Sequence, residues 1–371
     1  MEINLKVKTN LQIRPFYLFF IISGLQLGVG IIGAPRFIFL EAERDSWLSI
    51  LIAFLFTCLV VAAMFYILNQ YESADYFGIH VDVFGKWLGK LLGTVFIVFL
   101  FASFLSILMT YIQVVQIFIY HALPNWVLTV LIMILVLYAV FGGIRVVVGV
   151  GFVLFLITFW LLVTLVDPIT RMNWLNLLPM FQATLPELLK GARATAYTLS
   201  GFEILMIIYP FIINKHKAKL PTYLGLAYTS FILLLVTIIS IGYFSSIGLK
   251  NINWAVLILV KSASFTFLER IDYIVVVMWL MVIIPNLVFL MWAIAHGLKR
   301  MYKITQKKTH FILTIIILII VNFFHYDYQI TALTDWIAKV SFWVVYIYPF
   351  ILLPLVMIKK KWKTKKGSGQ S

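Results

Sequence analysis

Charge is scarce in this sequence. Only 12% of the 371 residues are Asp, Glu, Lys or Arg, whereas 63% are hydrophobic. Soluble globular domains carry about 25% charged residues, so the composition excludes an ordinary water-soluble protein. Cysteine is scarcer still, because Cys58 is the only one. A single cysteine forms no intrachain disulfide and builds no thiolate zinc site.

Patterns typical of catalysis are missing as well. The six histidines show no paired spacing of the kind that metal ligands have. The segment 78–86 lacks the glycine spacing of a phosphate-binding loop, and Trp87 stands where such a loop needs Ser or Thr. The sequence contains no serine nucleophile elbow and no twin-carboxylate spacing. We therefore expect no enzyme activity, no metal ion and no cofactor.

Apolar runs of about 20 residues, the length that crosses a bilayer as a helix, recur along the chain. Because lipid-exposed backbone must satisfy its own hydrogen bonds, these runs predict an all-α integral membrane protein. We treat 1–371 as one membrane domain. Ten spans are predicted, at residues 14–40, 47–69, 91–120, 125–141, 146–166, 187–213, 221–247, 272–298, 310–325 and 336–358.

The positive charges are distributed unevenly over the predicted loops. With ten spans, most of the 29 Lys and Arg residues fall on the side of both termini, including the basic tail 359–371. Cytoplasmic loops are enriched in Lys and Arg, so both termini are predicted to be cytoplasmic. The net charge of +15 is therefore interpreted as topogenic and lipid-facing charge, and no nucleic acid is expected as a partner.

The order of spans repeats along the chain. A broken span, an intact span and an amphipathic linker of about 20 residues, 70–90, are followed by three more spans. The same order begins again at 187, with a similar linker at 249–270. Five is an odd number, so the second set enters the membrane from the opposite side. The pattern predicts a 5+5 inverted repeat of 12–166 and 187–358, as in many secondary transporters.

The first predicted break lies in the first span. Gly28, Gly30 and Gly33 precede Pro35 within eight residues, and glycine and proline both disfavour helix. Unwound backbone in the membrane needs polar partners, such as a ligand. The alternative is close helix packing, for which Gly24 and Gly28 have the right spacing.

The second predicted break lies in the sixth span, at 197–203. Glu203 is near the middle of this span, where an ionised carboxylate costs about 2.5–3.5 kcal/mol on insertion scales. In one interpretation Glu203 caps amide groups freed by the break at 28–33. In the other, it contacts a ligand ammonium group or exchanges a proton. The two roles are compatible.

Two broken helices place half-helix N-termini and free carbonyls at mid-membrane depth, which suits a ligand with both a carboxylate and an ammonium group. An amino acid has both. Glycines allow its close approach, and an apolar side-chain pocket is expected around Val29, Ile31, Ile32 and Phe202.

Other polar residues within spans give weaker signals. Arg36 and Asp335 are both expected near the outer membrane surface and form a candidate gate. A polar face of the third span is either a helix contact or a cavity wall; it consists of Ser103, Ser106, Thr110 and Gln113. A kink is expected at 285–286, where proline and asparagine interrupt the eighth span.

Seven short motifs together resemble one known family. Gly28-Val-Gly-Ile-Ile-Gly33 and Gly201-Phe-Glu203 are similar to the paired motifs of the amino acid–polyamine–organocation transporter superfamily. More specific motifs, spread over nearly the whole chain, resemble the endospore germination permease family. They are Ile13-Arg-Pro-Phe16, Gly33-Ala-Pro-Arg36, Tyr71-Glu-Ser-Ala-Asp75, Asp82-Val-Phe-Gly-Lys-Trp87 and Phe141-Gly-Gly-Ile-Arg-Val146.

The resemblance implies a B-type membrane subunit of a spore germinant receptor, located in the spore inner membrane. Its implied partners are an A-type membrane subunit, a C-type lipoprotein and a small nutrient germinant such as an amino acid. The ligand-contact positions that it implies are Gly28, Val29, Gly30, Ile31, Thr198, Ser200, Gly201 and Phe202. Some proton-coupled superfamily members have a lysine in the fifth span, which 146–166 lacks.

Three functions fit these features. The first is a nutrient-sensing subunit that binds its ligand between the broken helices and signals by a conformational change. The second is a secondary amino acid transporter. The third is a ligand-gated ion-conducting subunit, for which Glu203 is the only mid-span charge that offers support.

Overall fold

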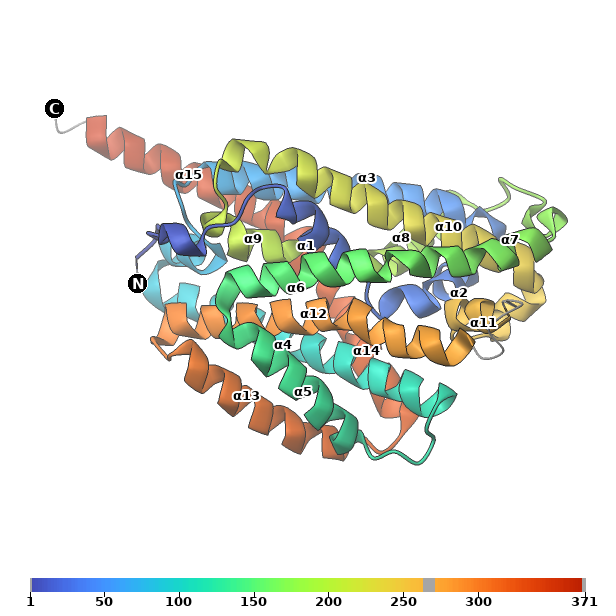
Figure 1. Cartoon of the computed structure of the whole chain (residues 1–371). Coiled ribbons are helices and arrows are strands. Elements are labelled where there is room, and N and C mark those ends of the chain that lie inside the picture. The colour runs from blue at the N-terminus through green and yellow to red at the C-terminus, as the bar shows by residue number, and fades with distance from the viewer. Residues whose placement is uncertain (1, 263–270, 369–371) are drawn as a thin grey trace.

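The computed structural model describes residues 2–262 and 271–368, and most of them are helical (Figure 1). The helices of the first half are α1 (Tyr17–Gln26), α2 (Gly30–Ala42), α3 (Ser46–Asn69), α4 (Tyr76–Phe118), α5 (Asn125–Phe141), α6 (Gly143–Thr158) and α7 (Val166–Arg171). The helices of the second half are α8 (Leu185–Thr198), α9 (Leu205–Ile208), α10 (Lys219–Asn251), α11 (Ala255–Ser262), α12 (Ile271–Tyr302), α13 (Gln306–Ile320), α14 (Asp327–Ser341) and α15 (Tyr348–Ser368).

Several of these helices are long and apolar enough to span a bilayer. Within the described residues seven helical stretches meet that test, or eight if α8 and its bent continuation to Phe211 count as one span. Helices α1 and α5 are apolar but shorter. The predicted all-α membrane architecture is confirmed, whereas the number ten and the 5+5 repeat remain predictions. Both termini lie at the same end of the bundle (Figure 1).

Two predicted boundaries differ from the helices of the structure. Helix α4 begins at Tyr76, where the Asp75 carboxylate caps it by accepting from the backbone N–H of Gly78 at 2.8 Å. A non-helical residue, Gly85 with φ 83°, separates this first segment from the longer one that contains most of the predicted span 91–120. The predicted linker 70–90 is therefore partly helical.

The last predicted span, 336–358, starts nine residues too late. Helix α14 begins at Asp327. The residues of its first turn are polar, and their sequence predicts a loop. Gln329 stabilises this turn by accepting from the backbone N–H groups of His325 and Tyr326. The predicted linker 249–270 contains α11, and its residues 263–270 lie outside the described part of the chain.

Helix α12 is the central column of the bundle. It packs against α4, α6 and α5 and touches α1 (Figure 1). Helix α8 lies between α2 and α3, and α10 packs on α1, α2 and α3. Nearly all inward-facing side chains are apolar and form one large core. This packing holds the first break against α12.

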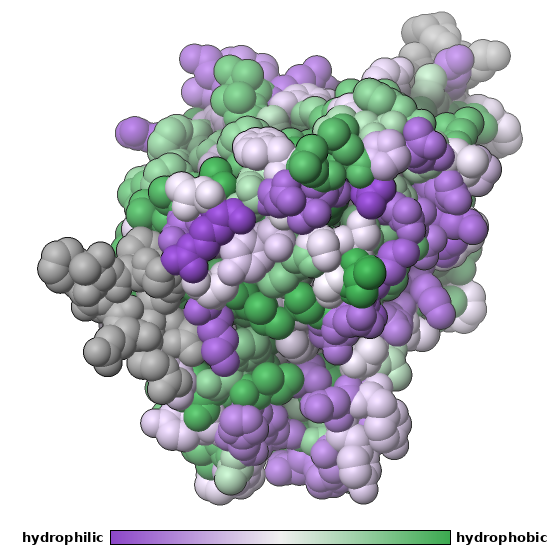
Figure 2. All heavy atoms as spheres, turned by 90° about the vertical axis from the view of Figure 1, so that its right-hand side faces the viewer, coloured by the Kyte–Doolittle hydropathy of each residue, from purple (hydrophilic) through white to green (hydrophobic). Residues whose placement is uncertain are grey.

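The outer surface of the bundle is apolar too. Leu55 and Leu59 of α3 are 62% and 60% exposed, and Leu131 and Ile134 of α5 are similarly exposed. Apolar side chains on the outside of a helical bundle fit a hydrocarbon surrounding. The end face opposite the termini carries many hydrophilic residues mixed with apolar ones (Figure 2), as expected where a membrane protein meets water.

Candidate functional site

The first break separates α1 from α2. Helix α1 ends at Gln26, Leu27 leaves the helical region with ψ 79°, and α2 begins at Gly30. Val29 is the N-cap of α2, and no side chain caps the helix there. The first backbone N–H groups of a helix have no partner within it. The break therefore presents uncapped N–H donors inside the bundle.

The second break follows α8. Helix α8 ends at Thr198, Gly201 adopts a left-handed φ of 112°, and the chain bends by 57° before it continues to Phe211. The Glu203 carboxylate accepts from the backbone N–H of Gly201 at 2.7 Å. Glu203 thus caps its own break, not the break at 28–33 that one interpretation of the sequence favoured.

The two breaks lie against each other through their glycines. A Cβ on Gly30 would sit 3.3 Å from Thr198 Oγ1, and one on Gly201 would sit 3.0 Å from Leu25 Cβ. Each glycine of one break therefore lies against a residue of the other broken helix. A larger residue at either position has to displace its neighbour.

Two amide side chains hold the broken ends in place. Gln26 donates from Nε2 to the carbonyl of Leu199, and Asn286 of α12 donates from Nδ2 to the carbonyl of Gly24 at 2.9 Å. Gln26 is 2% exposed, and its Oε1 is buried without a hydrogen-bond partner. An unsatisfied buried acceptor is costly, so Gln26 is held here at the expense of one hydrogen bond.

A cavity of about 70 Å³ lies between the breaks, and we call it the central cavity. Helices α1, α2, α4, α8, α12 and α14 contribute to its wall. The predicted site residues that line it are Gly28, Val29, Gly30, Thr198, Ser200, Gly201 and Glu203. Ile31 lines a different cavity, and Phe202 packs edge-on against the Tyr346 ring with centroids 5.2 Å apart.

Sequence reasoning missed some residues of the central cavity. Gln26 gave no signal because it is a single amide in an apolar run. Asn286 was recognised only as part of a kink, although it lines the cavity. Ser103 also lines the central cavity, whereas the hydroxyl groups of Ser106 and Thr334 are joined by a hydrogen bond of 2.9 Å. The polar face of the third predicted span thus combines cavity wall and helix contact.

A second, larger space adjoins the central cavity on the side away from the termini. This vestibule has a volume of about 420 Å³ and shares a wall with the central cavity. The shared wall consists of Val29, Gly30, Tyr197 and Thr198. A short wall of side chains and backbone therefore separates a wide opening from the small central cavity.

Arg36 and Asp335, the predicted outer gate, both line the vestibule. No ion pair joins these two described residues. Arg36 instead donates from Nε to the carbonyl of Lys250 at 2.9 Å. The gate remains a prediction. The part of the chain that the structure describes contains no group of three or more His, Cys, Asp or Glu residues placed to hold a metal ion.

The sequence matches one protein family. A family model described as spore germination protein matches residues 12–330. The chain is also 30% identical to spore germination protein GerQB of Bacillus cereus, over 95% of this chain and 97% of that protein. The chain belongs to the spore germination protein family. Two further members, both of Bacillus subtilis, are YndE, at 22% identity over 94% and 95% of the two chains, and spore germination protein A2, at 21% over 96% and 99%.

A solved transporter shares the fold of this germination protein. The structure is Mhp1, a nucleobase-cation-symport-1 family transporter in a closed conformation with bromovinylhydantoin bound. The TM-score is 0.63, the sequence identity is 12%, and the match covers 92% of this chain and 81% of the transporter. At that identity the likeness shows the fold alone.

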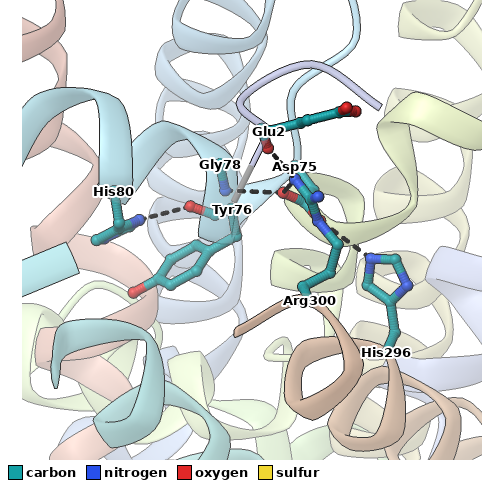
Figure 3. A network of polar contacts seen from close by, with 7 residues as sticks. All are labelled: Glu2, Asp75, Tyr76, Gly78, His80, His296 and Arg300. Atoms are coloured by element: carbon teal, nitrogen blue, oxygen red, sulfur yellow. Dashed lines mark hydrogen bonds and ion pairs between the residues drawn. The ribbon is translucent and has the colours of Figure 1, made fainter. Parts of the chain in front are cut away.

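A buried ion pair closes the end of this germination protein where the termini lie (Figure 3). Arg300 of α12 donates to the Asp75 carboxylate at 2.8 and 3.1 Å, and His296 lies 3.0 Å from it. The Asp75 side chain has 0% exposure. Burial raises the pKa of Asp75, but the hydrogen bonds and charges of His296 and Arg300 outweigh burial, so this pKa lies below its ordinary value.

The N-terminal segment 2–13, which we call the strap, crosses the same end. Arg300 also donates to the carbonyl of Glu2, at 2.9 Å. The backbone N–H of Leu5 donates to the carbonyl of Ser73 at 2.8 Å, and the backbone N–H of Ile13 donates to the carbonyl of Phe211 at 2.8 Å. The strap thus connects α12, the start of α4 and the end of the second broken helix. The strap thus covers the end of the bundle at which both termini lie. We call this end the termini end.

Proposed function

We propose that this chain is the nutrient-sensing subunit of a spore germinant receptor. In this proposal a small germinant binds in the central cavity between the two breaks. The bound ligand changes the relative position of the broken helices, and partner subunits respond to that change. Its proposed location is the spore inner membrane, with both termini on the core side. An A-type membrane subunit and a C-type lipoprotein are its proposed partners.

The buried acceptor Gln26 Oε1 is the observation that carries this proposal. It belongs to a residue that lines the same cavity as the uncapped N-terminus of α2, so an unpaired acceptor and free donors come from the residues of one wall. Helix N-termini bind carboxylates, and an amide oxygen accepts from an ammonium group. An α-amino acid offers both groups at the required short separation. The Glu203 carboxyl group lies in the same wall.

The cavity volume narrows the class of germinant. An engineered cavity of about 150 Å³ holds benzene, with six heavy atoms. By the same ratio the central cavity, at about 70 Å³, holds about three heavy atoms, fewer than the five of glycine. Even the smallest amino acid therefore requires the two breaks to move apart, and larger germinants such as sugars and nucleosides are disfavoured further. The vestibule provides the route by which such a ligand reaches the shared wall at Gly30 and Thr198.

A secondary amino acid transporter is the second candidate, and the fold shared with Mhp1 favours it. Transport requires the termini end to open and release the ligand. That end is closed by the strap and by the buried pair of Asp75 with Arg300, and these contacts have to separate before it opens. Sensing needs no such opening, so the closed end supports the sensing proposal.

Ligand binding to the purified chain in lipid nanodiscs tests the proposal. We expect one of the common small amino acids to bind saturably by calorimetric titration. Gly30→Ala adds a methyl group 3.3 Å from Thr198 Oγ1 and is expected to weaken binding by about tenfold. Gln26→Met removes the buried acceptor and is expected to weaken binding by a similar factor.

Gly149→Ala is the matched control, because its added Cβ meets no heavy atom within 4 Å and it lies in α6, away from the central cavity. Its affinity is expected to equal that of the unchanged protein. Absence of binding by every amino acid contradicts the proposed ligand class. Gradient-driven accumulation of the ligand in proteoliposomes that contain only this chain favours the transporter instead.

A further inference from the structure

A π-helical turn joins α14 to α15. It comprises Phe342–Ile347, between Ser341, the last residue of α14, and Tyr348, the first residue of α15. A π-helical turn bonds residue i to i+5 instead of i+4, so it contains one residue more than an α-helical turn. Such turns are rare and occur frequently at functional sites. We call Ser341 together with this turn the junction.

The junction caps the end of α8 at the second break. In a continuing helix the backbone N–H of Ser200 would donate to the carbonyl of Ala196, but here it donates to Tyr197. The freed carbonyl of Ala196 accepts instead from the Tyr346 hydroxyl of the junction, at 2.7 Å. The Ser200 hydroxyl also donates to this carbonyl, at 3.0 Å, and lies 2.8 Å from the hydroxyl of Ser341. Two side chains of the junction are therefore bonded to the break.

These contacts between the junction and the second break are buried. Tyr346 is 0% exposed and Ser341 is 1% exposed. The Tyr346 ring packs edge-on against Phe202, which follows the break, and is stacked on Phe56 of α3 with centroids 5.9 Å apart. A buried carbonyl that loses its donor is costly. A displacement of the end of α8 therefore acts directly on the junction.

Helix α15 runs from the junction to the termini end (Figure 1). The hydroxyl of Tyr348 is hydrogen-bonded at 2.6 Å to Nε2 of His80, which lies near the start of α4 (Figure 3). Further along α15, Nζ of Lys360 lies 3.8 Å from the centroid of the Tyr71 ring. The start of α4 also carries Asp75, which pairs with α12. Helix α15 thus connects the second break to the contacts that close the termini end.

We propose that the junction transmits the state of the second break to the termini end, with Tyr346 and Ser341 as its positioning residues. This inference rests on the proposed function, since it names the route from the ligand to the partner subunits. A ligand that moves the end of α8 withdraws the contacts that hold the π-helical turn. When the turn returns to α-helical geometry, α15 shifts by one residue, which is about 1.5 Å along its axis and about 100° around it. The shift separates Tyr348 from His80 and changes the surface of the termini end.

A displacement of the second break without any ligand tests this route. Gly30→Ala adds a methyl group 3.3 Å from Oγ1 of Thr198, the last residue of α8, and so pushes the end of that helix. Gly201→Ala displaces the same break from its other side, against Leu25. Two different variants are used so that a folding failure of one of them does not decide the outcome.

The distance between α15 and α12 at the termini end is the measurement. Spin labels are placed on the exposed positions Lys361→Cys and Lys299→Cys, in a background in which the only cysteine is removed by Cys58→Ser. Pulsed electron paramagnetic resonance then gives the distance in nanodiscs. Gly30→Ala is expected to change this distance by about 1.5 Å or more, and Gly201→Ala is expected to change it in the same direction.

Two further substitutions disconnect the junction from the break. Tyr346→Phe and Ser341→Ala each remove one oxygen, and together they are expected to abolish the distance change that Gly30→Ala causes. Tyr111→Phe is the matched control. Tyr111 is 3% exposed, and its hydroxyl also donates to a carbonyl, that of Val276 at 3.3 Å. This control is expected to keep the full distance change.

The outcomes are distinct from those of the ligand titration. An unchanged distance in both Gly30→Ala and Gly201→Ala overturns the inference. A distance change that persists when Tyr346→Phe and Ser341→Ala are combined overturns it as well. No germinant is used, so a failure of every amino acid to bind contradicts the proposed function without altering this result.

Discussion

Replacement of Asp75 by asparagine tests how the termini end is held closed. Asp75→Asn keeps the size of the side chain and removes its negative charge. The amide then turns an N–H group toward Arg300 or His296, which are themselves donors, and the Arg300 guanidinium stays 11% exposed with no counter-charge from Asp75. The perturbation therefore breaks a buried pair from one side without creating a cavity.

The size of the effect follows from burial. Removing one partner of a buried ion pair costs about 3–5 kcal/mol. The pair of Glu43 with Lys250 has a comparable separation of 2.7 Å, but its side chains are 62% and 44% exposed, and exposed pairs contribute about 0–1 kcal/mol. Glu43→Gln is thus the matched control for the loss of one carboxylate charge.

Thermal unfolding of the purified protein in nanodiscs is the assay. At about 2 °C per kcal/mol for a large domain, Asp75→Asn is expected to lower the apparent Tm by about 6–10 °C, and Glu43→Gln by about 2 °C or less. The double variant Asp75→Asn with Arg300→Met removes the uncompensated charge and is expected to melt above Asp75→Asn alone. Equal melting of Asp75→Asn and Glu43→Gln would refute the reasoning.

Three further predictions follow from the same geometry. The folded pKa of Asp75 lies below its ordinary value, so its stabilising contribution is complete above about pH 4, where a free aspartate ionises. This contribution is lost as pH falls through the folded pKa, and the Tm difference between the unchanged protein and Asp75→Asn is expected to shrink in acid. Gly201→Ala forces a left-handed φ of 112° on alanine and moves a Cβ to 3.0 Å from Leu25; it is expected to lower the apparent Tm and to abolish amino acid binding in the same titration. Glu203→Gln keeps an oxygen for the Gly201 N–H, so the Tm is expected to stay within about 2 °C, and a tenfold or larger loss of affinity then shows that the carboxylate contacts the ligand.

The two breaks could be predicted because they depend on local chemistry. Glycine at 28, 30 and 201 and a mid-span carboxylate at Glu203 are unfavourable in an ordinary membrane helix, so their presence marks a place where the helix ends. The start of α14 at Asp327 was missed for the opposite reason. Its first turn is polar, and the sequence does not show that Gln329 stabilises it as helix.

The wall of the central cavity was harder to predict, because it depends on the rotation of each helix. Ile31 follows directly after three residues of that wall, yet it lines a different cavity. Gln26 is a single polar side chain in an apolar run, and its Oε1 has no hydrogen-bond partner. Burial and unmade hydrogen bonds are properties of the packed molecule and leave no pattern in the sequence.

The strap imposes an order on the biogenesis of this protein. Glu2 leaves the ribosome 298 positions before its partner Arg300. Leu5 and Ile13 bond to Ser73 and Phe211, which are synthesised earlier than α12. The strap can therefore dock in steps, and the bond from Arg300 to Glu2 is the last of these contacts to become available.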